Sequence, residues 1–394
     1  MKKKKISVFK NLNKWILFLT LALSIMGALL ILDASSISSV LRYHNSSPYY
    51  FFTRQLVMLG IGYVGALIII KFPTRLYREV SLIFSVICIG IMGVTLGLSP
   101  ALGNIRTVTI TIGSITFQPA EFLKVLLVMY MGVFYGNWVN TIHKTKWSFI
   151  IPLIPCALSS ILVFGGGDLG TVVVMLALFA LVLMVVPARQ ENDKFFKITK
   201  GIGVGCLIAG ILFLKFAYLV IPEHVLLSDP RLARLYYVDA CDRYEDDSGY
   251  QVCNGYIAMN NGGVTGTGIG NSIQKYLYLP ESHTDFIFPI IIEEFGILVG
   301  IVIIVAYMIL LYCVFNIASH TKNLQNSIIC YGIGIYFLLH IFVNLGGVLG
   351  IIPLTGVPLP FLSYGGSFCV SLIFAFAIVQ RINIENKEAL QARK

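Results

Sequence analysis

Charged side chains are scarce in this chain. Asp, Glu, Lys and Arg make up 12% of its 394 residues, whereas apolar and aromatic residues make up 57%, and the mean hydropathy is +0.83. A soluble protein of this length has too little interior to bury so much apolar surface. Many apolar runs reach the roughly 20 residues that a helix needs to cross a bilayer. The composition therefore excludes a soluble globular protein and predicts an all-α polytopic membrane protein.

The apolar runs also lack the alternation of apolar and polar residues that marks the strands of a membrane β-barrel. The first run, WILFLTLALSIMGALLIL at 15–32, does not alternate. Because backbone groups in lipid must be paired internally, such runs cross the membrane as helices. No small-residue cleavage site of the signal-peptide type follows the first run, so we expect it to be retained as the first span.

The pattern predicts about ten transmembrane helices in one membrane domain, residues 15–381, between a basic tail, 1–14, and a second tail, 382–394. A long outer loop, 223–285, separates the seventh and eighth helices. The predicted spans cover residues 15–33, 54–70, 79–98, 118–138, 148–165, 169–187, 201–222, 286–314, 326–347 and 368–381.

The net charge is +10, but the placement of the basic residues argues against a nucleic-acid partner. They cluster in MKKKKISVFKNLNK at the start, in the closing ARK, and in the short loops on one side of the predicted spans. The positive-inside rule identifies that side as the cytoplasm. An even number of spans then places both termini in the cytoplasm and the 223–285 loop outside.

The outer loop is rich in charge and glycine, and loops of this length are often functional. It holds Cys241 and Cys253, whereas the other cysteines lie in or beside spans, where cysteine acts as a small hydrophobe. The outer side of the membrane permits disulfides. The two cysteines therefore form either a bridge or a pair of free thiols.

Charged residues in or beside the spans are candidate functional residues, because they are costly in lipid. Glu121 and Lys124 share one helix face, so they either pair with each other or line a polar cavity that opens outward. Arg106 precedes them in a stretch where Thr and Ile alternate, which indicates an extended or amphipathic segment at the membrane surface. Its guanidinium either reaches the headgroups or binds a phosphate. Asp168 is expected to cap the sixth helix.

Asp285 stands at the outer end of the eighth span, in LPESHTDFIFPIIIEEFG at 279–296. A carboxylate at such a half-dry position has a raised pKa, which suits a general base, although Asp is also a common helix cap. Glu293 lies about 12 Å deeper and is turned by only about 80°, so we expect it to face the same cavity, while Glu294 faces a neighbouring helix. His283 precedes Asp285 by two residues, and such a pair is weak evidence for a metal site.

Two segments of the outer loop lack the spacing of a known ligand site. The stretch GVTGTGIGNS, at 263–272, has no Lys-Ser/Thr after its glycines, which argues against nucleotide binding. Its backbone N–H groups remain available to a lipid phosphate. The acidic cluster at 239–247 matches no EF-hand. We therefore predict no metal site.

The stretch IIPLTGVPLPFLSYGGSF, residues 351–368, cannot be a regular helix in lipid. We expect it to re-enter the protein and form one wall of an outer cavity. It carries Thr355, Ser363 and Ser367. The outer half thus offers cations for phosphates and a carboxylate for a proton, which suits a substrate with an anionic head and a membrane-embedded tail.

Three segments, YLPESHTDFIFPIIIEEFG, FQPAEFLK and LTGVPLPFLSYGGS, resemble signature segments of the SEDS family (shape, elongation, division and sporulation), and the resemblance covers nearly the whole chain. LDASSISSV and SPYYFFTRQLV are more similar to its FtsW branch than to RodA. The resemblance implies a glycosyltransferase of the bacterial plasma membrane that polymerises lipid II, an undecaprenyl diphosphate disaccharide-pentapeptide. The implied partners are a class B penicillin-binding protein, other division or elongation proteins and membrane lipids.

The resemblance matches Asp285 to the essential Asp of the family, which would deprotonate the acceptor sugar. The outer-loop motif departs from the family, because Ile105-Arg106-Thr107 lacks the usual Trp. No cofactor is implied with certainty, and a requirement for a divalent cation, Mg²⁺ or Mn²⁺, is left open. The predicted substrate-binding residues are Arg106, Glu121, Lys124, Gln251, Lys275, His283, Thr355, Ser363 and Ser367.

Two other functions are compatible with a membrane protein of this kind. A lipid II flippase would need a charged path through the whole membrane, but the ionisable groups favour the outer half. An ion-coupled transporter would place broken helices and ligands near the midplane. The distribution of charge favours chemistry at the outer surface.

Overall fold

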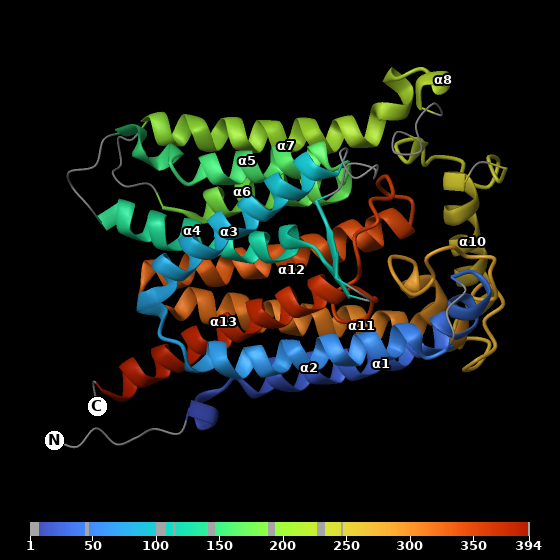
Figure 1. The fold of residues 1–394 in the computed structure, drawn as a ribbon, viewed down its shortest axis with the longest axis horizontal. Coiled ribbons are helices and arrows are strands. Elements are labelled where there is room, and N and C mark those ends of the chain that lie inside the picture. Colours follow the sequence, from blue (N-terminus) through green and yellow to red (C-terminus); the bar gives the residue numbers. More distant parts are fainter. Residues whose placement is uncertain are drawn as a thin grey trace.

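The computed structural model describes residues 8–43, 47–99, 108–112, 115–140, 146–187, 194–226, 233–245 and 247–392. Within these ranges, nine helices are long and apolar enough to cross a membrane, and Leu169–Val185 is a shorter apolar helix. The fold is an all-α membrane bundle, as predicted. Its ten helices (Figure 1) are α1 (Lys14–Leu41), α2 (Tyr50–Lys71), α3 (Tyr77–Leu98), α4 (Pro119–Asn140), α5 (Leu153–Gly165), α6 (Leu169–Val185), α7 (Lys194–Val220), α11 (Ile287–His320), α12 (Leu324–Val348) and α13 (Gly366–Gln391).

Helices α4, α12 and α13 form the centre of the bundle. In the most apolar stretch of each, the buried share of residues is 89% for α13 and 67% for α4 and α12, but only 6% for α7. Helix α7 accordingly lies at one edge of the bundle (Figure 1). The polar residues that α4 and α12 carry are therefore inside the protein, where each needs a partner.

The start of α1 and the end of α13 lie side by side at one end of the bundle (Figure 1). The Asn13 backbone N–H donates to Gln380 Oε1 over 2.8 Å, and Gln380 Nε2 donates to Asn13 O over 2.9 Å. Lys387 Nζ donates to Asn11 O over 2.9 Å. Both ends of the membrane domain thus share one side, as an even number of spans requires.

Four helices extend at least six residues beyond their predicted spans, and one of them, α7, does so at its start, because it begins at Lys194 and not at residue 201. Helix α1 continues to Leu41, α11 to His320 and α13 to Gln391, so much of the predicted tail 382–394 is helical. Hydropathy locates only the part of a helix that lies in lipid, whereas the helix continues as long as its backbone hydrogen bonds do. The Asp168 side chain accepts from Thr171 N at the start of α6 over 2.9 Å, so it caps that helix as predicted.

The opposite end of the bundle carries the outer elements α8 (Glu223–Leu226) and α10 (Asp247–Gly262) (Figure 1). Before α4, the strands β1 (Ile110–Ile112) and β2 (Ile115–Phe117) form an antiparallel hairpin. The alternating Thr and Ile residues are therefore extended, as predicted.

Helix α11 is broken at Gly296, whose φ is 81° and ψ is 169°. A break in a membrane helix frees backbone groups that need partners. The glycine-rich segment, residues 263–272, provides them by packing against the break. Three backbone hydrogen bonds join the two: Thr267 N–H to Glu293 O (2.9 Å), Gly268 N–H to Glu294 O (3.0 Å) and Ile297 N–H to Gly263 O (3.0 Å).

These bonds correct the prediction that the glycine-rich segment offers its amides to a lipid phosphate. The N–H groups of Gly266, Thr267 and Gly268 donate to backbone carbonyls within the protein. A Cβ atom at Gly266 would lie 2.2 Å from Glu294 O. Gly266 is therefore required because the segment approaches α11 too closely for a side chain at that position, whereas Gly263, Gly268 and Gly270 share with it a positive φ that favours glycine.

Candidate functional site

Asp285 lies in the turn that precedes α11. Its side chain is 7% exposed, and Thr284 Oγ1 donates to its Oδ1 over 3.0 Å. Its backbone carbonyl accepts from Asn344 Nδ2 of α12 over 2.9 Å. Phe286, not Asp285, occupies the cap position of α11. The carboxylate is therefore not used as a helix cap, and its backbone is fixed by a central helix.

The proline- and glycine-rich stretch packs beside Asp285, as predicted for a buried re-entrant loop. Asn344 Nδ2 also donates to Val357 O of this stretch over 2.8 Å. A Cβ atom at Gly356 would lie 3.9 Å from Asp285 Oδ2 and 3.5 Å from Arg234 Nη1. Gly356 has a φ of 69°, which favours glycine. The bare backbone at Gly356 thus adjoins both the carboxylate and an exposed guanidinium.

The electrostatics of the site favour a protonatable carboxylate. Burial, and then the negative charge of Glu281, raise the pKa of Asp285 to about 6, although the Thr284 hydrogen bond and the Arg234 charge act in the opposite direction. Asp285 forms no ion pair with any residue that the structure describes. An ionisable group with this pKa and no ion-pair partner among the described residues can exchange a proton near neutral pH.

His283 is 2% exposed and packs among aromatic rings. Its ring centroid lies 4.3 Å from that of Phe51 and 5.7 Å from that of Tyr364. Burial lowers the pKa of His283 to about 4, so the ring is neutral at physiological pH. Among the described residues, no three His, Cys, Asp or Glu side chains gather to hold a metal ion. His283 is thus a buried neutral ring beside the site.

Lys275, which we predicted to bind substrate, is held by two carboxylates. Its Nζ lies 2.6 Å from Glu294 Oε1 of α11 and 2.8 Å from Asp33 Oδ1 of α1. The Lys275 side chain is 6% exposed. The ion pairs join the outer loop to α1 and α11, and they occupy the ammonium group.

Glu293 does not face a cavity shared with Asp285, and that prediction is wrong. Its carboxylate accepts from the Ser272 hydroxyl, and also from Ile273 N over 3.2 Å and Gln274 N over 3.3 Å. A buried carboxylate needs several donors, and the outer loop supplies them. Glu293 and Glu294 together fix residues 272–275, the segment that leads to Asp285.

Glu121 and Lys124 pair inside the bundle and do not line an outward cavity. Lys124 Nζ donates to Glu121 Oε1 over 2.9 Å and lies 3.2 Å from His340 Nε2 of α12. Lys124 is 1% exposed and Glu121 is 4% exposed. The prediction that these two residues pair with each other is therefore confirmed. Pairing satisfies two charges that would otherwise be buried alone.

Two predicted substrate-binding serines act as braces. Ser367 Oγ accepts from Gln118 N over 2.9 Å and donates to Thr116 O over 3.1 Å, which joins α13 to the start of α4. Ser363 Oγ accepts from Leu359 N over 2.8 Å within its own turn. Both hydroxyls thus stabilise the wall of the site.

Three other predicted residues have different positions. Thr355 is half-buried and adjoins Gly356, so it lies beside the site. Gln251 is half-buried on α10. Arg106 lies outside the described residues. Of these three, only Thr355 is the chain neighbour of a residue that adjoins Asp285.

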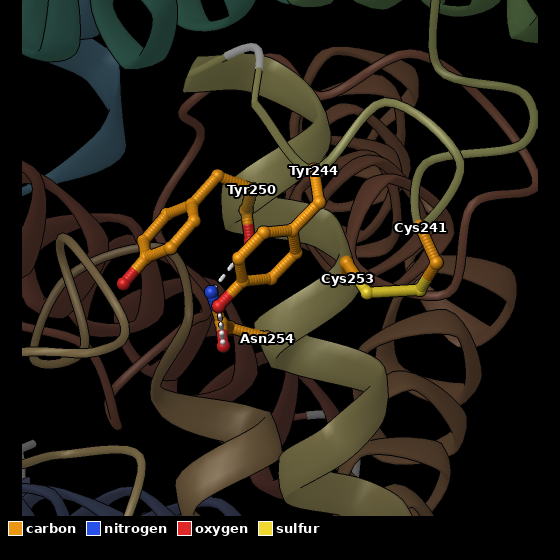
Figure 2. The surroundings of a disulfide bond; sticks show 5 residues. All are labelled: Cys241, Tyr244, Tyr250, Cys253 and Asn254. Carbon is orange, nitrogen blue, oxygen red and sulfur yellow. Dashed lines mark hydrogen bonds between the residues drawn. A yellow bond between two sulfur atoms is a disulfide. The ribbon is translucent and has the colours of Figure 1, made fainter.

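Cys241 and Cys253 form a disulfide, which settles the alternative left open by the sequence. Figure 2 shows the bridge beside α10, which carries Cys253. Asn254, next in the chain, donates from Nδ2 to Tyr250 O over 2.9 Å (Figure 2). The bridge ties the chain that carries Arg234 to α10.

The sequence did not single out three residues that surround the site. Arg234 adjoins Gly356, Glu281 raises the pKa of Asp285, and Arg54 of α2 lines a cavity beside Tyr364. A signal for Arg234 was present, because the outer face carries few basic residues. Glu281 gave no separate signal among the acidic residues of its loop.

Comparisons with known proteins agree with this architecture. The chain matches the model of the FtsW/RodA/SpoVE cell cycle proteins over residues 14–388. It is 32% identical to the probable peptidoglycan glycosyltransferase FtsW of Enterococcus hirae, over 95% of this chain and 92% of the relative. It is 31% identical to the protein of the same name from Bacillus subtilis, over 97% and 94%.

The fold is also similar to a solved structure. A chain described under "Structural coordination of polymerization and crosslinking by a peptidoglycan synthase complex" superposes with a TM-score of 0.68 at 21% identity. The match covers 95% of this chain and 98% of the other. The two chains therefore share the all-α membrane fold.

Proposed function

We propose a role for Asp285 from the premise that this chain belongs to the FtsW/RodA/SpoVE family of cell cycle proteins. The chain is a multi-pass membrane protein and a peptidoglycan glycosyltransferase. Its substrate is lipid II, and its reaction joins the disaccharides of two lipid II molecules into a glycan strand. Asp285 is the general base.

In the proposed reaction, the Asp285 carboxylate takes the proton from a hydroxyl of the acceptor sugar. The oxygen attacks the anomeric carbon of the donor, and the bond from that carbon to the diphosphate oxygen breaks. The lipid diphosphate leaves with the electron pair, and the configuration at the carbon inverts. The observation that carries this role is a carboxylate at the outer end of α11 that is buried, has no ion-pair partner among the described residues, and has a pKa raised to about 6.

Arg234 suits the departing diphosphate. Its guanidinium is exposed and lies close to Gly356, which also adjoins Asp285. A guanidinium matches phosphate oxygens in geometry and charge, and it stabilises the negative charge that develops as the bond breaks. The described residues form no cluster of metal ligands, so a divalent cation would enter with the substrate diphosphate.

The site belongs at the outer face of the bacterial plasma membrane, with both termini in the cytoplasm. The basic loops support this orientation. A class B penicillin-binding protein is the proposed partner, because cross-linking of peptides has to follow polymerisation of glycans. Other division or elongation proteins would join the same assembly, and the relatives named FtsW favour the division branch.

The test is polymerisation of lipid II by the purified protein with Asp285 replaced. We expect Asp285→Asn and Asp285→Ala to reduce strand formation roughly 10²- to 10⁴-fold, the usual contribution of a general base. Asp242→Asn is the matched control, because Asp242 is an exposed carboxylate of the same outer loop. Normal polymerisation by folded Asp285 variants would refute the role. Transfer of lipid II across vesicles without strands would support a flippase instead.

A further inference from the structure

A cavity with a volume of about 220 Å³ lies between α2, β2 and the start of α13. Asp285 is not among the residues that line it. Its lining combines polar and apolar side chains. The lining residues that matter are the polar Thr53, Arg54, Thr116 and Tyr364 and the apolar Val57 and Met58.

Arg54 brings a positive charge into this cavity that no carboxylate neutralises. Its guanidinium lies over the Tyr50 ring, with Cζ 3.9 Å from the centroid, and its side chain contacts the Tyr364 hydroxyl. Its Nε is buried and has no hydrogen-bond partner among the described residues. Arg54 is also absent from every ion pair that the described residues form. A buried, unpaired N–H of a cation is the feature expected of a site for an anion.

The cavity is connected to Asp285 through two residues. The Tyr364 backbone N–H donates to His283 O over 2.8 Å, and the two rings are 5.7 Å apart. Asp285 follows His283 by two residues, and Arg234 adjoins Asp285 at Gly356. Two arginines from different elements are thus linked to the carboxylate, Arg234 through Gly356 and Arg54 through Tyr364 and His283.

A reaction between two lipid-linked disaccharides brings two diphosphates to one base. The leaving diphosphate is bonded to the carbon under attack, so it lies next to the base. The acceptor diphosphate lies farther away, because it is attached to one sugar of the acceptor while the attacking hydroxyl is on the other. The two arginines are placed in this order, with Arg234 near Asp285 and Arg54 farther away.

We propose that the Arg54 cavity is a second diphosphate subsite and that it holds the diphosphate of the acceptor lipid. This assignment rests on the proposed function. The guanidinium pairs with the phosphates, and the hydroxyls of Thr116 and Tyr364 donate to the remaining oxygens. The substrate class is a polyprenyl diphosphate that carries a sugar.

The outer surface of α2 provides a path for the polyprenyl chain. Four apolar side chains of α2, the first of which lines the cavity, are spaced by four, three and four residues, which places them on one face of the helix. All four are at least half exposed on the membrane-facing surface. They are Val57 (52%), Ile61 (50%), Val64 (62%) and Ile68 (65%). A ligand with an anionic head and a long apolar tail fits this arrangement.

The test counts bound undecaprenyl diphosphate by native mass spectrometry on the full chain that carries Asp285→Asn, so that no turnover is needed. We expect two bound molecules. Adding Arg54→Gln should leave one, with affinity for the second lowered roughly 10- to 100-fold, as for loss of a charged hydrogen bond. Arg78→Gln, an exposed arginine at the other end of the bundle, is the matched control and should leave two.

Thr53→Glu is a second variant, which places a negative charge at the cavity without touching the Arg54 packing. Thr53 is exposed, so this change should not disturb folding, and it should also leave one bound molecule. Two molecules bound to both variants would overturn the proposal. Displacement of the second molecule by phosphatidylglycerol at equal concentration would also overturn it, because the site would then be a general anionic-lipid site. The proposed function is tested separately, by the polymerisation assay: strand formation by Asp285 variants would refute the role of Asp285, whereas the binding experiment tests only the second subsite.

Discussion

The ion pairs of Lys275 yield a prediction whose size follows from burial. Lys275→Met removes the cation that Glu294 and Asp33 share. The Glu294 side chain is 1% exposed, whereas that of Asp33 is 27% exposed and can be hydrated. Loss of one partner from a buried ion pair costs about 3–5 kcal/mol. We expect the free energy of unfolding to fall by about this amount, mostly because Glu294 is left buried and unpaired.

A second replacement should restore most of this loss. In Lys275→Met/Glu294→Leu neither buried charge remains, and apolar replacement of a buried pair is often close to neutral. We therefore expect the double variant to be more stable than Lys275→Met by about 2–3 kcal/mol. The rest of the lost stability is not regained, because Asp33 still lacks its ion-pair partner. The assay is equilibrium unfolding of the purified protein in bicelles. Lys322→Met, at an exposed position, is the control and should change stability by less than about 0.5 kcal/mol.

The same variants separate structure from substrate binding. If Lys275 contacted lipid II, Lys275→Met would raise KM and leave the unfolding transition in place. If it is an ion-pair partner, stability falls and the double variant regains it. Unchanged stability in Lys275→Met together with a raised KM would refute the reasoning from burial.

Two further predictions concern the base and the broken helix. Asp285 must be deprotonated to act and its pKa is raised to about 6, so the initial rate of polymerisation should rise as the pH increases through about 6. Glu281→Gln should shift this rise in rate to lower pH, and Arg234→Gln should shift it to higher pH. A pH profile that neither variant shifts would contradict the assignment of Asp285 as the base. At Gly296, a Cβ atom would lie 2.2 Å from Val264 O at a φ of 81°, so Gly296→Ala should lower the unfolding free energy by at least about 1–3 kcal/mol, whereas Gly97→Ala, with no atom within 4 Å, should be tolerated.

The ten spans were predictable from the sequence because lipid selects for long apolar runs, and the runs here are long. The break in α11 was not, because a single Gly in an apolar run gives no sign that another segment will pack against it. Gly296 adopts its conformation only because the 263–272 segment supplies the missing hydrogen bonds. A hydropathy profile does not show such contacts, because the residues of the 263–272 segment lie outside the apolar run that contains the break.

The sequence could indicate candidate residues for the site, but it could not predict the contacts that each candidate makes in the structure. The catalytic role of Asp285 stays a prediction; the sequence drew attention to this residue because a carboxylate at the end of an apolar run is unusual. Lys275 and Ser367 were placed with the substrate, since a polar side chain near a site does not reveal its partner in the sequence. Arg54 was missed for a related reason: an arginine near a span end is usually interpreted as a snorkelling residue.

The contact between the glycine-rich segment and Gly296 has a consequence for biosynthesis. Both sides of the contact lie within residues 263–297, and the segment leaves the ribosome before the helix that it supports. The exposed carbonyls of the break can therefore be paired as soon as α11 enters the bilayer, before α12 and α13 have been made. Insertion of this helix does not have to wait for the last two spans, because the backbone groups at its break form hydrogen bonds with residues that have already been synthesised.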